Sequence, residues 1–367
     1  MKTKILIFLV LQLIFLDLHS QPNKPYYSLD EALKTPTLVY DLYINSIGLE
    51  ELPDEIGTLV NLKELLVGDN KLTKLPRSIG NLKKLERLEL GGNKLSSLPN
   101  EFGELTSLKI LSLTGNKFDS LPDQICKLKN LEFFYLSHNK LSTLPKNFGN
   151  LKNLKELNLI SNDLTTLPES FCNLTNLTIL YLTYNELTYL PDEISKLTSL
   201  NELVVENNKL TGITENIGDL ENLTRFDLSF NSISTLPESI GKLNNLKVLE
   251  IKYNKLKTLP EKIGELTNLT GLVASNNEIL QLPNSICLLR NLEILYLGFN
   301  ELVEIPDCVV SLSKLSSLGL EHNKIEKCPI FFKMENLKHL SLHYNNLSDE
   351  EKTRLIENLG ANFDVKL

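Results

Sequence analysis

The residues of this chain that could carry redox or nucleophilic chemistry are its five cysteines. Cys126, Cys172 and Cys287 are separated by multiples of 23 residues and share a position that is otherwise Gly or Ser, which predicts small buried fillers. Cys328 replaces a core leucine. Only Cys287 and Cys308 fall on adjacent copies of the 23-residue pattern, so only they could form a disulfide. The pattern itself favours free thiols. We therefore expect structural cysteines.

Histidine chemistry is concentrated near the carboxyl end. His322, His339 and His343 fall close to Glu321, which leaves a metal site open, although solvated histidines are the preferred interpretation. The sequence has no Gly-rich phosphate loop, nucleophile elbow or zinc signature. We therefore predict a non-enzymatic protein without a cofactor or a metal.

A third candidate chemistry is recognition by aromatic and apolar side chains at positions where packing does not require them. These side chains fall on outward strand positions, or just before a recurring Asn, and rings presented there suit a binding surface. An open alternative is that the rings before the Asn are half-buried against the turn. The candidate binding residues are Phe133, Tyr135, His138, Ile179, Tyr181, Tyr184, Val204, Phe230, Tyr253, Tyr296 and Phe299.

A repeat of 23 residues must position all of these side chains. The stretch 61–84, NLKELLVGDNKLTKLPRSIGNLKK, has the spacing L-x-x-L-x-L-x-x-N-x-L, and it returns until Asn345. The L-x-L segment predicts a short strand, and Pro76 predicts the start of a helical or 3₁₀ turn. We expect Asn70 and its equivalents to bond backbone groups of their own turn and the next. Stacking predicts an α/β solenoid with a parallel sheet on its concave face, short helical or 3₁₀ turns on its convex face, and helical caps.

The repeat divides the chain into four predicted segments. Residues 1–20 combine Lys2 and Lys4 with an apolar run and predict a cleaved signal peptide. Residues 21–37 form an amino-terminal cap that begins with a capping box at Ser28. Residues 38–347 form about 14 repeats, and residues 348–367 form a carboxyl-terminal cap with a second capping box at Ser348.

The charge of the chain limits its partners. A formal net charge of −8 and a pI near 5.4 argue against a nucleic-acid partner or an anionic membrane surface. Membrane association is not expected once the signal peptide is cleaved.

From Val39 to Leu347 the chain resembles the leucine-rich repeat superfamily. It is most similar to the 23-residue L-P-x-x-I class of Ras-group and Ras-scaffold proteins and of secreted bacterial proteins. The resemblance implies protein–protein recognition, and the amino-terminal segment agrees with the bacterial, exported members. The first hypothesis is therefore an exported protein, secreted or in the cell envelope, that holds a protein partner on its concave face. Alternatives are glycan binding by the same face, and an intracellular signalling scaffold if residues 1–20 are not a signal.

Overall fold

The computed structural model describes residues 24–329, 331, 334–358 and 364–366. The chain forms two compact units, and we treat each by itself. The first unit includes residues up to 141 and residues 145–154, and the second includes residues 142–144 and 155 onward. The predicted signal peptide at 1–20 lies outside the described residues.

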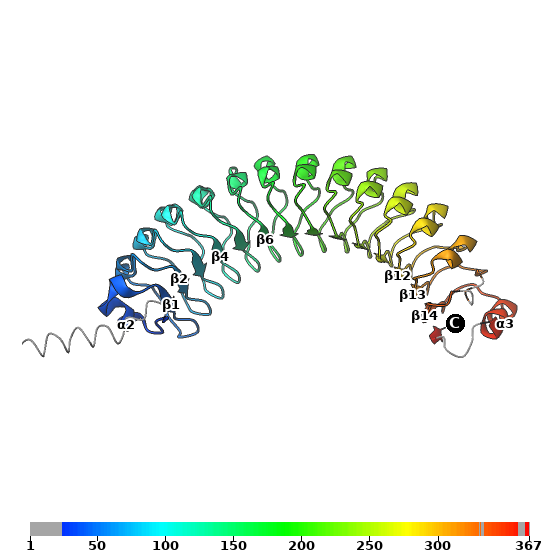
Figure 1. Ribbon diagram of the computed structural model, residues 1–367, viewed down its shortest axis with the longest axis horizontal. Helices are drawn as coiled ribbons and strands as arrows, with labels where there is room; N and C mark the ends of the chain where they lie inside the picture. The colour runs from blue at the N-terminus through cyan, green and yellow to red at the C-terminus, as the bar shows by residue number, and fades with distance from the viewer. Residues whose placement is uncertain (1–23, 330, 332–333, 359–363, 367) are drawn as a thin grey trace, which may run out of the picture. The chain divides into compact units, whose positions relative to one another are not determined.

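The first unit begins with a short helix and continues as strands that alternate with 3₁₀ turns (Figure 1). Its parallel sheet has the strands in chain order. Its helix and 3₁₀ turns are α2 (Leu29–Lys34), η1 (Pro36–Leu38), η2 (Asp54–Thr58), η3 (Arg77–Asn81), η4 (Asn100–Glu104), η5 (Asp123–Lys127) and η6 (Phe148–Asn150). Its strands are β1 (Asp41–Tyr43), β2 (Glu64–Leu66), β3 (Arg87–Glu89), β4 (Ile110–Ser112) and β5 (Phe133–Tyr135).

The second unit continues the alternation and ends with a helix and a last strand. Its strands are β6 (Glu156–Asn158), β7 (Ile179–Tyr181), β8 (Glu202–Val204), β9 (Arg225–Asp227), β10 (Val248–Glu250), β11 (Gly271–Val273), β12 (Ile294–Tyr296), β13 (Ser317–Gly319), β14 (His339–Ser341) and β15 (Asp364–Lys366). Its helical elements are η7 (Glu169–Asn173), η8 (Asp192–Lys196), η9 (Glu215–Asp219), η10 (Glu238–Lys242), η11 (Glu261–Glu265), η12 (Asn284–Leu288), η13 (Asp307–Ser311) and α3 (Asp349–Asn358).

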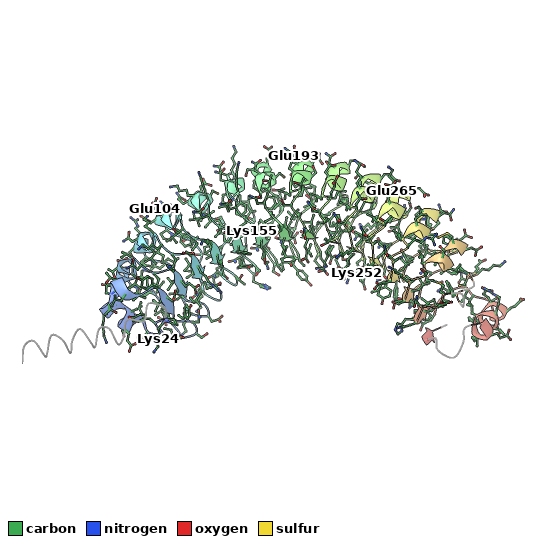
Figure 2. The ribbon with its side chains drawn as sticks, in the orientation of Figure 1. Lys24, Glu104, Lys155, Glu193, Lys252 and Glu265 are labelled. Atoms are coloured by element: carbon green, nitrogen blue, oxygen red, sulfur yellow. A yellow bond between two sulfur atoms is a disulfide. The ribbon has the colours of Figure 1, made fainter. Side chains whose placement is uncertain are left out.

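Strand register follows the repeat. Leu249 of β10 pairs with Phe226 of β9 and with Leu272 of β11, each 23 residues away. In each unit the strands lie on the concave side and the 3₁₀ turns on the convex side (Figure 1). Within the second unit, Figure 2 labels Glu193 and Glu265 on the turn side and Lys252 on the strand side. The predicted solenoid geometry is confirmed.

The Asn at the end of each strand binds backbone groups from inside the turn. Asn254 is 8% exposed, and its Nδ2 donates to the carbonyls of Ile251 and Leu228 at 3.2 and 3.0 Å. Its Oδ1 accepts a hydrogen bond from the amide of Ile233 at 2.9 Å. The bonds to neighbours therefore run to the preceding repeat, whereas the sequence analysis expected the next one. The reason is that the amide, directed inward, meets the free carbonyl and amide of the turn already stacked before it.

The convex side stacks closely because its small-residue positions face the backbone of the following turn. A Cβ added at Gly57 would lie 2.7 Å from both the carbonyl oxygen and the Cβ of Ser78, which is 21 residues further on. Cys126 and Cys172 occupy the same position and are buried. Burial raises the pKa of each of these thiols to about 11, so neither is a thiolate nucleophile near neutral pH.

The expectation that Cys287 remains a free thiol is wrong. Cys287 and Cys308 form a disulfide between η12 and η13, with Cα atoms 5.7 Å apart. The cause is the same close contact, because the small-residue position of one turn faces the residue 21 positions later. Cys126, Cys172 and Cys328 are free, as predicted.

Both predicted capping boxes have hydrogen bonds at their first residue. The hydroxyl oxygen of Ser28 accepts from the amide of Glu31 at 3.4 Å, and that of Ser348 accepts from the amide of Glu351 at 3.1 Å. Within the part of the chain that the structure describes, no helix has both the length and the apolar character to cross a bilayer.

Candidate binding surface

The outward positions that each repeat presents on the strand side include three at or near the strand. They are the first strand residue, the third strand residue, and the residue directly before the buried Asn, which we call the pre-Asn position. The middle strand residue points into the core, so the burial pattern of β7 and β12 alternates along the strand. The predicted binding residues fall on these three positions.

The pre-Asn residues have a left-handed backbone. Tyr184, Tyr253 and Phe299 have φ of 55°, 55° and 57°, a region that costs a residue with a Cβ about 1–2 kcal/mol relative to the usual helical region. Gly92 and Gly115 occupy the equivalent position in other repeats, with φ of 67° and 65°. The backbone therefore favours Gly here, and the ring residues are placed against that preference.

This conformation turns the rings into solvent. Tyr184, Tyr253, Phe299 and Tyr344 are 58%, 47%, 46% and 72% exposed. The alternative that the rings are half-buried is therefore wrong for Tyr184 and Tyr344, whereas Tyr253 and Phe299 are about half-covered and each stacks on a neighbouring ring. Phe230 has an intermediate exposure.

Neighbouring rings stack along the pre-Asn column of the second unit. The ring centroids of Phe230 and Tyr253 are 4.3 Å apart, with the planes inclined by 13°. His322 lies between Phe299 and Tyr344, with centroid distances of 4.1 and 4.3 Å. The rings cover one another's faces and present their edges, and this stacking reduces the conformational entropy that binding would cost.

Charged side chains surround the central strands of the second unit. The hydroxyl of Tyr181 donates to Glu202 at 3.1 Å, and burial together with the Glu202 charge raises the pKa of Tyr181. Arg225 pairs with Glu202 at 2.7 Å and with Glu250 at 2.9 Å. This network therefore holds the half-buried side chain of Tyr181 in place.

The same network contains a buried acidic pair. Asp227 is 4% exposed, and burial raises its pKa to about 6, assisted by a hydrogen bond to Glu250. Burial opposes ionisation of Glu250 too, but hydrogen bonds from Asp227 and Arg225 outweigh it and lower the pKa of Glu250. Asp227 is thus the member of the pair that takes up a proton below about pH 6, and Glu250 is the ionised partner of Arg225.

One predicted binding residue is not on the surface. Val204 is 5% exposed, although it occupies the outward third position of β8. Its register partners are Tyr181 and Asp227, and the short valine lies between these larger side chains. The prediction that Val204 is a contact residue is therefore wrong. Its position is outward, but exposure there depends on the size of the neighbouring side chains.

The remaining candidates lie on the strand side of their own units. In the first unit, Phe133 and Tyr135 are half-buried on β5 and His138 is exposed at the pre-Asn position. In the second unit, Ile179 is half-buried on β7 and Tyr296 is 40% exposed on β12.

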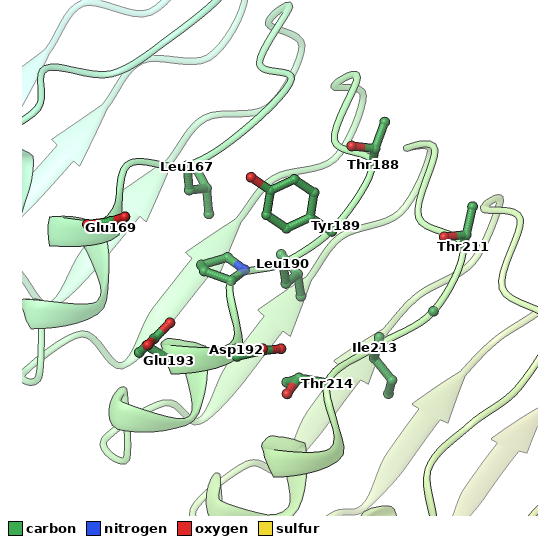
Figure 3. A pocket seen from close by; sticks show the side chains of 12 residues that line it. Leu167, Glu169, Thr188, Tyr189, Leu190, Asp192, Glu193, Thr211, Ile213 and Thr214 are labelled. Atoms are coloured by element: carbon green, nitrogen blue, oxygen red, sulfur yellow. The ribbon is translucent and has the colours of Figure 1, made fainter.

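Two depressions in the second unit were not predicted as sites. A cavity of about 480 Å³ lies on the flank between strands and turns, and it is lined by Tyr189, Leu190, Ile213 and Thr214 (Figure 3). Here Thr214 replaces the proline that precedes the 3₁₀ turn in the adjacent repeats, and Gly212 has open space around it. A second depression, of about 490 Å³, lies on the strand side next to Tyr296 and Phe299. Among the described residues, no group of three or more His, Cys, Asp or Glu side chains is placed to hold a metal ion.

Comparison with known families agrees with this geometry. The model of the leucine-rich repeat region matches residues 4–120 and 122–233, and a second leucine-rich repeat model matches residues 221–279 and 267–325. The chain belongs to the leucine-rich repeat family. Members of this family are commonly protein-binding modules and are generally non-enzymatic scaffolds. No curated protein sequence matches the chain significantly.

Several solved leucine-rich repeat structures are similar to the chain. The Leptospira interrogans protein LIC12759 is 35% identical, with a TM-score of 0.68, and the match covers 94% of this chain and 100% of that one. The Toll–Spätzle complex of Drosophila is 28% identical, with a TM-score of 0.74, and the match covers 88% of this chain and 46% of that one. The internalin InlF of Listeria monocytogenes is 24% identical, with a TM-score of 0.73 and 92% coverage of both chains, a likeness in fold.

Proposed function

We propose that this leucine-rich repeat protein is an exported, non-enzymatic binding protein that holds a protein partner on its strand side. The observation that carries the proposal is the placement of exposed rings at left-handed pre-Asn positions. Tyr184 is 58% exposed, and Tyr253 and Phe299 remain about half-exposed although each stacks on a neighbouring ring, while the backbone would be more relaxed with Gly. Rings kept at such positions are accounted for by contact with another molecule.

The chemistry of the surface favours a protein over a glycan. A sugar ring stacks on the open face of an aromatic ring, whereas His322 has both faces covered, and Phe299 and Tyr344 each have one face covered by it. Beside the Phe230–Tyr253 pair, the Tyr181–Glu202–Arg225 network adds fixed charges of both signs. Fixed rings beside satisfied charges resemble the anchors and polar rim of a protein interface. The Toll–Spätzle complex shows that a related leucine-rich repeat protein is found in complex with a protein.

Two observations support export. Residues 2–20 have the composition of a signal peptide, with lysines followed by an apolar run. The Cys287–Cys308 disulfide belongs to an oxidising compartment, outside the bacterial cytosol. The similarity to a Leptospira protein supports a bacterial source, so we place the exported protein in the cell envelope or outside the cell. Amino-terminal sequencing of the mature protein tests this proposal, with Gln21 as the expected first residue. A protein that keeps Met1 and remains in the cytosol would contradict it.

The binding proposal is tested by cross-linking capture with the mature chain, followed by binding measurements with the purified partner. Tyr184→Ala combined with Tyr253→Ala should weaken binding by tenfold or more. The matched control combines Tyr189→Ala and Leu288→Ala, which remove side chains 52% and 55% exposed on the flank and on a 3₁₀ turn. Equal affinities of the two double variants would remove the pre-Asn rings from the interface. Selective binding on a glycan array, without a protein partner, would favour the glycan alternative.

A further inference from the structure

A hollow on the strand side of the second unit arises from small residues in successive strands. Gly319 and Ser341 occupy the third position of β13 and β14, where β12 has Tyr296. Gly298 lies two residues after Tyr296 on the same side. The resulting depression of about 490 Å³ has buried Leu318 as part of its floor. The hollow is thus formed by the sequence of these strands rather than by an accident of one side chain.

A carboxylate lies inside this hollow. Glu321 extends over Gly298, and any Cβ on Gly298 would overlap its Oε1. Its Oε2 is 3.2 Å from the place where a Cβ on Gly319 would stand. The two glycines therefore provide the space in which the carboxylate lies flat on the sheet.

One oxygen of this carboxylate lacks a hydrogen-bond donor. Oε2 of Glu321 is buried from solvent and has no hydrogen-bond partner among the described residues. A buried oxygen without a donor destabilises the structure, and a charged one does so more strongly. The nearby lysine, Lys324, is paired with Glu301. Because Oε2 lies against the sheet, a cation in the hollow would pair with the carboxylate once the Glu321 side chain turned toward it, and the missing donor favours that turn.

An aromatic wall stands beside the carboxylate. A Cβ built on Gly319 would lie 3.1 Å from Cδ1 of Tyr296 and close to Oε2 of Glu321. The tyrosine ring and the carboxylate therefore flank the same space above Gly319. On another side, Nδ1 of His343 and the hydroxyl of Ser341 are 2.9 Å apart and hydrogen-bond each other. A carboxylate next to a tyrosine ring binds an ammonium or guanidinium group by an ion pair and a cation–π contact together.

We propose that this hollow receives an arginine or lysine side chain of the protein partner, with Glu321 as the counter-ion and Tyr296 as the aromatic wall. The inference rests on the proposed protein-binding function and names the chemistry that the partner must present there. The negative charge of Glu321 would repel a carboxylate or phosphate group of a ligand. The absence of a three-ligand group among the described residues gives no support to a metal ion as the occupant.

The test needs no knowledge of the partner. The probes are N-acetyl-arginine amide, N-acetyl-lysine amide and the neutral analogue N-acetyl-citrulline amide, added to the mature chain labelled with ¹⁵N-histidine. We expect saturable shifts at His339 and His343 with the cationic probes and weaker ones with citrulline. His138, in the first unit, should not respond. Equal binding of citrulline and the cations would overturn the proposal.

Variants separate charge from shape. Glu321→Gln keeps the side-chain volume and should weaken binding of the arginine probe by about tenfold or more. Tyr296→Ala should weaken it by about 3- to 30-fold, the range of a cation–π contact. Tyr189→Ala, which removes an exposed tyrosine from the flank, should leave it unchanged. Unchanged binding by Glu321→Gln, with circular dichroism showing a native fold, would also overturn the proposal. The Tyr184→Ala, Tyr253→Ala double variant should still bind the probe, so a failed protein-binding proposal is distinguished from a failed cation site.

Discussion

Cys287 and Cys308 connect two successive 3₁₀ turns of the second unit, although their sequence separation is 21 residues and strand partners are 23 apart. The difference arises because a small residue in one turn faces an earlier position of the following turn. Gly57 and Ser78 show the same offset, and so do Gly264 and Ser285. The disulfide therefore uses a contact that recurs throughout the repeats.

Reduction of this disulfide should destabilise the protein. Closing a 21-residue loop restricts the unfolded chain, and the expected gain is about 3 kcal/mol in the free energy of unfolding. Urea unfolding followed by circular dichroism should show a lower midpoint with a phosphine reductant for the wild type and no effect for Cys287→Ser combined with Cys308→Ser. The denatured wild type should titrate three free thiols. Five free thiols and no reductant effect would contradict the pairing.

Close stacking of the turns predicts different outcomes for two glycines. A Cβ on Gly218 would overlap the backbone carbonyl of Ser239, whereas a Cβ on Gly212 meets nothing within 4 Å. Neither has a positive φ, so only packing distinguishes them. Gly218→Ala should lower the free energy of unfolding by about 1–3 kcal/mol, as overpacking does, and Gly212→Ala should not lower it. Similar losses in both variants, measured by urea unfolding, would show that the turns are not close-packed.

The sequence predicted the repeating parts of the fold because every repeat satisfies the same conditions. Leu249 and Asn254 must point inward whatever surrounds the molecule, so their spacing was enough. The disulfide was left open because strand register suggests a 23-residue offset, and only the three-dimensional turn reveals an offset of 21.

The binding surface was less predictable, since outward positions depend on their neighbours. Val204 is covered because Tyr181 and Asp227 flank it, a relation that follows from register and side-chain size together. Glu321 lies over Gly298 through its side-chain torsions, which the spacing of residues does not encode. A comparison of adjacent strands for small residues beside large ones would have indicated this hollow.

The buried Asn residues should be needed for stability. Asn254→Ala removes the partners of the Ile233 amide and of the Leu228 and Ile251 carbonyls. We expect a loss of about 1–3 kcal/mol in the free energy of unfolding. Asn245→Ala is the control, because Asn245 donates only to Glu221 on the exposed surface. For Asn245→Ala, the decrease in the free energy of unfolding should stay below about 1 kcal/mol. A comparable loss in both variants would mean that burial of the amide is unimportant.

The acidic pair should make stability depend on pH. The pKa of Asp227 rises from 3.8 unfolded to about 6 folded, so between pH 4 and 6 the folded state binds more protons. Stability therefore falls as the pH rises through this interval, by about 1–3 kcal/mol. The lowered pKa of Glu250 acts oppositely, and its contribution is lost as the pH falls below its ordinary value of 4.5.

Asp227→Asn isolates this effect. The Asn oxygen can still accept from the Ser229 amide, and its nitrogen can donate to Glu250 without a proton being taken up. We expect the decline between pH 4 and 6 to disappear and the variant to be more stable than the wild type at pH 8. Asp163→Asn, at an exposed position, should keep the wild-type profile. An unchanged slope in Asp227→Asn, measured by urea unfolding at each pH, would contradict a raised pKa.

Substitution at Tyr184 separates a structural role of the pre-Asn rings from a binding role. Its φ of 55° costs any residue with a Cβ about 1–2 kcal/mol, so Tyr184→Gly should be more stable than Tyr184→Ala by about 1 kcal/mol. The ring itself is 58% exposed, so Tyr184→Ala should lie within about 0.5 kcal/mol of the wild type. Urea unfolding of the three proteins measures both differences. A ring that stabilised the turn would instead make both variants clearly less stable than the wild type, and its presence would then need no partner to explain it.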